Sequence, residues 1–269
     1  MSVLSEQDII DELGKGILIY PFNKSQLTGS ALALTASAYA YAIKDKKLLD
    51  AHSDPTQPEQ KFFTLPPRDT VLVWTNESVC INECFCGSIL ARVRLVSKGI
   101  GHIGTRVNPN WGGILCITLH NLSDVAIQIN LGEPIAYLRF HKLLSKSLTP
   151  KNLHDPARLD IIPESCPVPD KLHRWIHDPT KRWRRGNEEA LKEQLNNDSP
   201  DYKVILRDRE RQRKSFMLWL KRLTAPVVLS ALILIYLRIS PQNPLLGNLI
   251  LAIIPVVGTI AVEITLYKK

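Results

Sequence analysis

Acidic residues are absent from the stretch between Gly101 and Asn121, although this stretch has turn glycines, a tryptophan and a strand-like end. Because carboxylates are common general acids and bases, their absence excludes that chemistry from this segment. The rest of the chain is not poor in charge. Of its 269 residues, 22% are charged and 45% are hydrophobic, which excludes wholesale disorder and predicts one cored domain with further segments.

A secretory signal is missing from the N-terminus, which is polar and acidic, and the five cysteines are an odd number. This combination argues against a disulfide framework and predicts reduced thiols. The cysteine spacing in CINECFC, residues 80–86, is not that of a zinc knuckle. We therefore expect structural thiols and no metal site.

Charge is also missing from two runs near the C-terminus. Residues 223–237 carry no charge, and residues 245–267 carry only Glu263. At about 1.5 Å per residue, the second run can cross the roughly 30 Å hydrocarbon core of a bilayer. The sequence predicts a juxtamembrane helix followed by an α-helical transmembrane hairpin. We place them over residues 201–269, with spans at about 216–237 and 245–267.

Basic residues flank both predicted spans and are in excess only in the second half of the chain. Residues 151–269 hold 20 Lys and Arg against 13 Asp and Glu, whereas residues 1–150 hold 14 against 13. The positive-inside rule then predicts a multi-pass protein of the inner (cytoplasmic) membrane. Its globular domain and both termini face the cytoplasm. Glu263 either lies at the membrane interface or has a pore or gating role.

Residues 147–200 are rich in Pro, Asp, Lys and Arg. Within them, KRWRRG (181–186) mixes an aromatic residue with basic ones, as nucleic-acid contacts do. The nearby apolar runs favour a charged connector against the inner leaflet instead, so no nucleic-acid partner is expected. NEEALKEQL (187–195) predicts a short helix, and a longer helix is expected to start after Ser199-Pro200 and to continue into the first span.

The first 146 residues predict a different architecture. SEQDIIDELGKG, which starts at Ser5, is typical of a short capped helix that ends at a glycine. Short alternating or apolar runs follow, separated by turn signals such as PPRD and NPNWGG. This pattern predicts an all-β sandwich or barrel of the jelly-roll type.

The order of these segments resembles the trimeric dUTPase and dCTP deaminase superfamily over about residues 3–142. The segments that carry the resemblance are the opening helix and strand, QLTGSALALTASAYAY, the strand ending at Glu77-Ser78, ARVRLVSKGI, GTRVNPNWGG and LGEPIAYLRF. ARVRLVSKGI stands where a phosphate-binding motif is expected. The resemblance implies a distorted jelly roll over residues 1–146 that forms homotrimers, with nucleotide sites at the subunit interfaces.

The departures from the family pattern fall on its acids. Asn108 stands where dUTPases have the Asp that activates water, and Thr118 stands where deaminases have a proton-shuttling Glu. Ala33 replaces another acid that is common in the first motif. An amide does not titrate, and a hydroxyl is far too weak an acid or base near neutral pH. The resemblance therefore implies no catalytic residue in this chain.

The resemblance does imply ligand-binding residues. They are Arg92, Arg94, Thr105, Arg106, Asn108, Trp111 and Thr118. Arg92 and Arg94 could hold phosphate through charge-assisted forks, or lie on a solvated strand face. Trp111 either packs beneath a deoxyribose or belongs to the core, and His102 is expected to be exposed or capping rather than catalytic. No cofactor is expected, apart from Mg²⁺ if a nucleotide triphosphate binds.

Three functions follow from this combination. The first is a membrane-anchored, catalytically inactive nucleotide-sensing domain that controls a two-helix membrane effector, with bacterial antiviral defence as its setting. The alternative is an active membrane-bound dCTP deaminase or dUTP diphosphatase of pyrimidine deoxynucleotide metabolism. The third is a trimerisation module that presents the KRWRRG segment to a partner.

Overall fold

The structure is a computed structural model. It describes the backbone of residues 1–53, 56–102, 104–151, 155–164 and 166–239. The side chains of residues 218, 220–233 and 236–239 are not described. The second predicted membrane span, residues 245–267, lies outside the described residues.

The described residues contain the following strands: β1 (Ser2–Val3), β2 (Ile17–Tyr20), β3 (Leu27–Thr28), β4 (Ala31–Ala42), β5 (Lys47–Leu48), β6 (His52–Ser53), β7 (Lys61–Leu65), β8 (Thr70–Ile81), β9 (Phe85–Ala91), β10 (Ile100–Gly101), β11 (Arg106–Val107), β12 (Gly112–Asn121), β13 (Ile127–Asn130) and β14 (Pro134–Lys142). The α-helices are α1 (Glu6–Glu12), α2 (Val93–Val96), α3 (Asp170–Ile176), α4 (Glu188–Asp198) and α5 (Pro200–Ile239). The 3₁₀ turns are η1 (Lys24–Gln26), η2 (Leu159–Ile161) and η3 (Pro179–Arg185).

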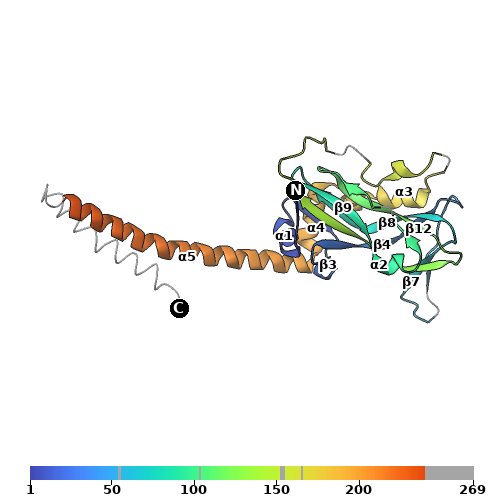
Figure 1. The fold of residues 1–269 in the computed structure, drawn as a ribbon, viewed down its shortest axis with the longest axis horizontal. Coiled ribbons are helices and arrows are strands. Elements are labelled where there is room, and N and C mark those ends of the chain that lie inside the picture. The colour runs from blue at the N-terminus through green and yellow to red at the C-terminus, as the bar shows by residue number, and fades with distance from the viewer. Residues whose placement is uncertain (54–55, 103, 152–154, 165, 240–269) are drawn as a thin grey trace. The chain divides into compact units, whose positions relative to one another are not determined.

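The strands form a curled antiparallel sheet and a smaller one (Figure 1). Within the described residues the large sheet has 11 strands, whose main path runs β10-β12-β8-β4-β14-β9-β11. The second sheet has the order β13-β7-β6. The central strand β8 is buried along most of its length, because β4 and β12 flank it on both sides. The all-β prediction for the N-terminal domain is confirmed.

The predicted capped N-terminal helix is also present. Ser5 Oγ accepts a hydrogen bond from the Asp8 amide at 3.2 Å, and the Asp8 carboxylate accepts one from the Ser5 amide at 2.9 Å. This reciprocal pair satisfies two amides that have no partner inside the helix. Gly14, with φ +83°, follows the C-cap, and a side chain there would collide with the ring of Tyr202.

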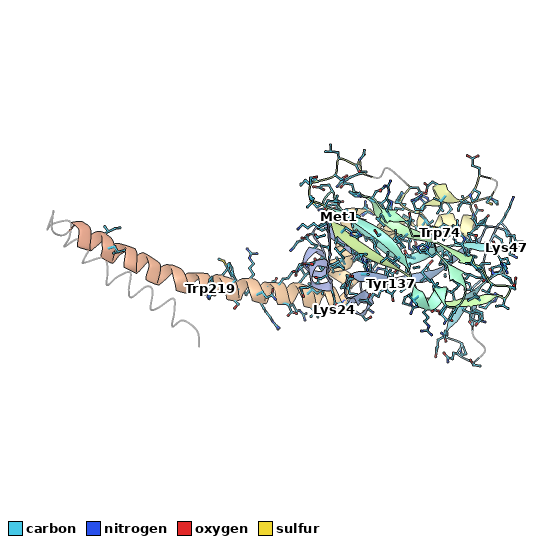
Figure 2. All side chains as sticks on the ribbon, in the orientation of Figure 1. Met1, Lys24, Lys47, Trp74, Tyr137 and Trp219 are labelled. Atoms are coloured by element: carbon cyan, nitrogen blue, oxygen red, sulfur yellow. The ribbon has the colours of Figure 1, made fainter. Side chains whose placement is uncertain are left out.

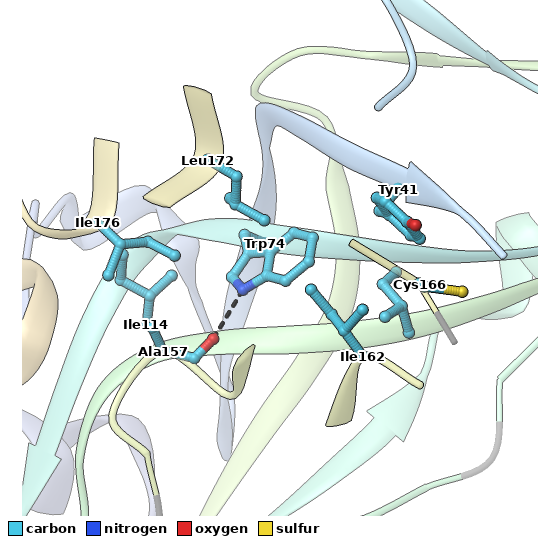
Figure 3. Close-up of a cluster of buried hydrophobic side chains, with 9 residues drawn as sticks. Tyr41, Trp74, Ile114, Ala157, Ile162, Cys166, Leu172 and Ile176 are labelled. Carbon is cyan, nitrogen blue, oxygen red and sulfur yellow. Dashed lines mark hydrogen bonds between the residues drawn. The ribbon is translucent and has the colours of Figure 1, made fainter. Parts of the chain in front are cut away.

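The connector predicted over residues 147–200 packs against the β domain. Met1–Lys203 form one compact unit, and Val204–Lys269 form a second. In Figure 3, Trp74 of β8 lies among residues from the region after the sheet. The members of this tryptophan cluster from that region are Ala157, Ile162, Cys166, Leu172 and Ile176. The Trp74 indole N–H donates to the Ala157 carbonyl at 2.7 Å. Because the connector is rich in charged residues, its composition did not indicate that these apolar side chains pack against the β domain.

The long helix predicted to follow Ser199 begins at Pro200 and continues to Ile239 as α5. It includes the whole of the first predicted span, residues 216–237. Phe216 and Trp219 are both more than half exposed, and their rings stack with centroids 5.9 Å apart. Within the described part of the chain, no helix combines the length and the apolarity needed to cross a membrane.

Leu172→Ala tests whether the connector belongs to the core of the β domain. Leu172 is fully buried, so we expect the unfolding free energy to fall by about 2–5 kcal/mol through lost burial and a residual cavity. Urea denaturation of the full chain in detergent, followed by tryptophan fluorescence, measures this change. Leu148→Ala, at a side chain that is 97% exposed, is the matched control. Equal stabilities of the two variants would contradict the packing.

Candidate functional site

Four of the predicted ligand-binding residues line one small cavity between β9, β11 and β12. Its volume is about 40 Å³, and we call it the β11 cavity. The four predicted residues are Thr105, Arg106, Asn108 and Trp111. The structure therefore brings these four positions together. The cavity is much smaller than a nucleotide.

The turn that carries Asn108 is held by its own neighbours. Asn110 has φ +59°, and its side-chain amide donates to the Thr149 carbonyl at 2.8 Å. The Ile81 amide donates to the Trp111 carbonyl at 3.0 Å, which ties the turn to β8. Trp111 is 6% exposed and thus belongs to the core while also lining the cavity. These contacts give Asn108 a defined position without help from a ligand.

The two glycines that start β12 allow a close approach of the chain's C-terminal part. A side chain at Gly113, where φ is +151°, would collide with the carbonyl of Pro156. A side chain at Gly112 would press on the backbone of Gly186. Both glycines therefore meet a backbone requirement at this contact.

The described lining of the β11 cavity contains no carboxylate and no histidine. Its titratable groups are the guanidinium groups of Arg106 and Arg158 and the thiol of Cys116. Burial raises the pKa of the Cys116 thiol far above its usual range, so the thiol stays protonated near neutral pH. The cavity can attract an anion, but it offers no general base.

The other three predicted ligand residues lie elsewhere in the protomer. Arg94 is exposed on α2, and Thr118 is half-buried on β12 and accepts a 3.0 Å hydrogen bond from His102 through its carbonyl. Arg92 donates to the Glu133 carboxylate at 3.3 Å and to the Pro134 carbonyl at 2.7 Å. In one protomer these residues do not complete the β11 cavity.

The alternative in which Arg92 and Arg94 lie on a solvated strand face is wrong. The strand β9 ends at Ala91, and Val93–Val96 form the short helix α2. The amides of Leu95 and Val96 both donate to the Arg92 carbonyl, so the backbone satisfies itself locally rather than in the sheet. Neither Arg92 nor Arg94 therefore lies on a strand face.

A second, larger cavity of about 810 Å³ lies beside β2, β4 and β8. We call it the tryptophan cavity, because Trp175 and Trp183 line it together with Arg184. The sequence prediction missed it, since these residues fall in the presumed connector. The aromatic residue inside KRWRRG was the one available signal, and Trp183 is in fact buried.

Glu77 lies in the wall of the tryptophan cavity and is only 1% exposed. It accepts hydrogen bonds from the Thr35 amide at 2.8 Å, the Thr35 hydroxyl at 2.6 Å and the Gln26 side chain at 2.6 Å. Burial raises the pKa of its carboxyl group, and this effect is larger than the lowering of the pKa by the hydrogen-bond donors. These bonds join β8 to β4 and η1. The Glu77 carboxylate therefore has a structural role at this position.

Among the described residues, no three or more His, Cys, Asp or Glu side chains gather in a way that could hold a metal ion. The five cysteines, all of them described, form no disulfide bond.

The architecture and the cavities together define a class of protein. It is an all-β domain with a curled antiparallel sheet, followed in the chain by a helical segment. A sequence profile described as dCTP deaminase-like matches residues 3–143. The chain therefore belongs to the dCTP deaminase-like family.

Individual relatives are distant. The dCTP deaminase of Thermococcus kodakarensis is 27% identical over 139 residues, which are 52% of this chain and 84% of that protein. The dCTP deaminase of Thermococcus gammatolerans is 29% identical over 132 residues, or 49% and 79% of the two chains. The solved 2′-deoxycytidine 5′-triphosphate deaminase of Agrobacterium tumefaciens aligns with 14% identity and a TM-score of 0.41. That alignment covers 51% of this chain and 47% of the other, so this chain spans about half its length.

Glu77→Gln tests the raised pKa of the buried carboxyl group. A carboxyl group whose folded pKa is raised binds more protons in the folded state, so the folded state loses stability as the pH rises above the ordinary value of 4.5. The substitution removes this loss. We therefore expect the stability of the variant, relative to the unsubstituted protein, to rise as the pH increases above the ordinary value of 4.5. Chemical denaturation at several pH values measures it.

Glu83→Gln is the matched control for this pH dependence. The hydrogen bond from Lys146 lowers the pKa of the half-buried Glu83 carboxyl group, so its contribution to stability is present above the ordinary value and is lost as the pH falls. The relative stability of this variant should fall as the pH rises, or stay level if solvent screens the pair. A flat profile for Glu77→Gln would show that burial does not raise its pKa.

Proposed function

We propose that this protein is a membrane-anchored nucleotide sensor whose dCTP deaminase-like domain binds a nucleotide without converting it and controls a two-helix membrane effector. The observation that carries the proposal is the lining of the β11 cavity. It holds Arg106 and Arg158 but, among its described residues, neither a carboxylate nor a histidine. Deamination and diphosphate hydrolysis both need a positioned acid or base. Such a cavity supports occupancy rather than turnover.

A homotrimer would explain why the β11 cavity is small and why the predicted ligand residues are dispersed. A nucleotide needs a pocket of several hundred Å³, whereas one protomer supplies about 40 Å³ here. Arg94 and Arg106 are both exposed and available to a neighbouring copy. We propose that adjacent subunits complete the nucleotide site, and that Mg²⁺ accompanies the ligand if it is a triphosphate.

The membrane part of the proposal rests on the sequence and on exposed aromatic residues. Phe216 and Trp219 follow a run of basic residues on α5, and such aromatic residues favour the headgroup level of a bilayer. The spans would be residues 216–237 and 245–267. The protein would then lie in the inner membrane, with its globular domain and both termini in the cytoplasm.

The cellular role that we propose for this device is antiviral defence in a bacterium. A domain that binds a nucleotide without consuming it can report the level of that nucleotide, provided that the ligand binds two conformations with different affinity. A membrane effector would then act only when the signal is present. A nucleotide-producing enzyme encoded beside this protein would support the role.

Binding without turnover is the first test. We expect isothermal titration calorimetry of the full chain in detergent to detect binding of dCTP or dUTP, with no release of ammonia or pyrophosphate. Arg106→Ala should weaken this binding about tenfold, since hydrogen bonds from charged donors are strong. Lys98→Ala, which removes an exposed charge outside the cavity, is the matched control. Release of product would instead establish an active enzyme, and failure of both nucleotides to bind would exclude them as the signal.

Membrane insertion is the second test. We expect the full chain to remain in the membrane pellet after carbonate extraction at high pH. Val256→Arg, near the middle of the second predicted span, should increase the extracted fraction, because an arginine at the centre of a span costs about 3 kcal/mol. Leu148→Arg places the same charge at an exposed position of the connector and should leave extraction unchanged. Full extraction of the unsubstituted chain would contradict the anchor.

A further inference from the structure

One loop of the β domain contacts both the tryptophan cavity and the first turn of α5. It consists of residues 21–26, and we call it the β2–β3 loop. All of its residues except Lys24 line the cavity. Lys24 instead contacts the start of α5, beside which Figure 2 labels it. Because α5 lies beyond the family-matched segment 3–143, this contact joins the family-type domain to a part of the chain that the profile does not include.

Ser199 is the residue at which α4 gives way to α5. Its backbone is extended, with φ −102° and ψ 105°. Its hydroxyl accepts a hydrogen bond from the Tyr202 amide at 3.4 Å and donates one to the Phe22 carbonyl at 3.3 Å. The first amides of a helix have no acceptor within the helix, so the bond from Tyr202 caps α5. The bond to Phe22 ties this cap to the β2–β3 loop.

The loop also holds the first turn of α5 through a charged acceptor. The Lys24 amide donates to the Asp201 carboxylate at 2.6 Å. A hydrogen bond to a charged acceptor is stronger than one between neutral groups. Ser199 and Asp201 both belong to the compact unit Met1–Lys203, and α5 continues from there to Ile239. Opening of the loop would therefore remove two supports of the first helical turn.

The other end of the loop is held by the wall of the tryptophan cavity. The Gln26 side-chain amide donates to the Glu77 carboxyl group at 2.6 Å and to the Ala33 carbonyl at 3.4 Å. Glu77 is 1% exposed on β8, so the core of the β domain fixes its position. The loop thus has one anchor in the cavity wall and another at the start of α5.

Hydrogen bonds within the loop join these two anchors. The Asn23 side chain accepts from the Ser25 amide at 2.9 Å and from the Ser25 hydroxyl at 2.7 Å. The Gln26 amide donates to the Asn23 carbonyl at 3.0 Å, and the Leu27 amide donates to the Lys24 carbonyl. Lys24 and Gln26 therefore belong to one hydrogen-bonded turn, and a change in the position of one affects the other.

We propose that the β2–β3 loop is a coupling element, which links the wall of the tryptophan cavity to the first turn of α5. Loss of the contact between Gln26 and Glu77 frees the loop and destabilises this turn, and opening of the turn loosens the loop in return. The proposal rests on the function proposed above, because it names the route by which the domain would control the helix that leads to the membrane. The coupling itself requires no ligand.

Hydrogen–deuterium exchange of the full chain in detergent, without ligand, tests the coupling from the cavity side. Gln26→Ala should raise the exchange rates of the amides of residues 202–206 about threefold to tenfold, because the loop loses an anchoring hydrogen bond. Asn76→Ala is the matched control, since Asn76 also lines the cavity but donates to Thr35 and Ala36 on β4. It should change these rates by less than about twofold, as expected for an uncoupled position.

A substitution in α5 tests the opposite direction. Asp201→Ala should raise the exchange rates of the Gln26 and Leu27 amides about threefold to tenfold, although both amides donate to carbonyls inside the loop. Asp201→Asn keeps an oxygen acceptor and should restore most of the protection. Asp170→Ala removes an exposed carboxylate from the first turn of α3 and should leave both rates within about twofold.

Gln26→Met keeps the length of the side chain and replaces Gln26→Ala if that variant does not fold. Unchanged exchange at residues 202–206 in the Gln26 variant would overturn the proposal, and so would equal effects of the Gln26 and Asn76 substitutions. Failure of dCTP and dUTP to bind would count against the proposed sensor alone, because these exchange rates are measured without ligand.

Discussion

The hydrogen bond from the Trp74 indole to the Ala157 carbonyl is the interaction on which the arrangement of this protein depends. Donor and acceptor residues are 0% and 1% exposed, so losing the acceptor would leave a buried N–H group without a partner. The bond holds the chain against β8 as it leaves the sheet. Leu172 and Ile176 then pack on the same indole and bring α3 to the β domain. The wall that Trp175 supplies to the tryptophan cavity follows from this packing.

A second constraint is the backbone contact between Gly112 and Gly186. A side chain at Gly186 would collide with the backbone of Gly112, and a side chain at Gly112 would press on the Gly186 carbonyl. Gly186 also has a left-handed φ of +65°. Gly112 directly follows the turn that carries Asn108 and Trp111, whereas Gly186 ends the turn that carries Arg184. The two turns therefore touch through their main chains.

Local patterns predicted the β domain well, because alternation of side chains and turn residues acts over a few positions. The capped helix at Ser5 and the start of α5 at Pro200 were both predicted in this way. The sequence did not predict α2, because the hydrogen bonds of α2 to the Arg92 carbonyl compete with strand pairing. Residue spacing does not show which of these two hydrogen-bonding patterns forms. Of the seven predicted ligand residues, Thr105, Arg106, Asn108 and Trp111 line the β11 cavity, whereas Arg92, Arg94 and Thr118 lie apart from it.

The sequence by itself determined the class of the domain and the residue types at its motif positions. Asn108 and Thr118 carry no side-chain group that exchanges a proton readily near neutral pH, and this holds in any conformation. Only the tertiary structure decided that a charged connector is part of the core and that Trp183 and Arg184 face a cavity with Glu77. Such contacts join residues about a hundred positions apart. They depend on which surfaces exclude water together, and that is a property of the folded chain rather than of any local pattern.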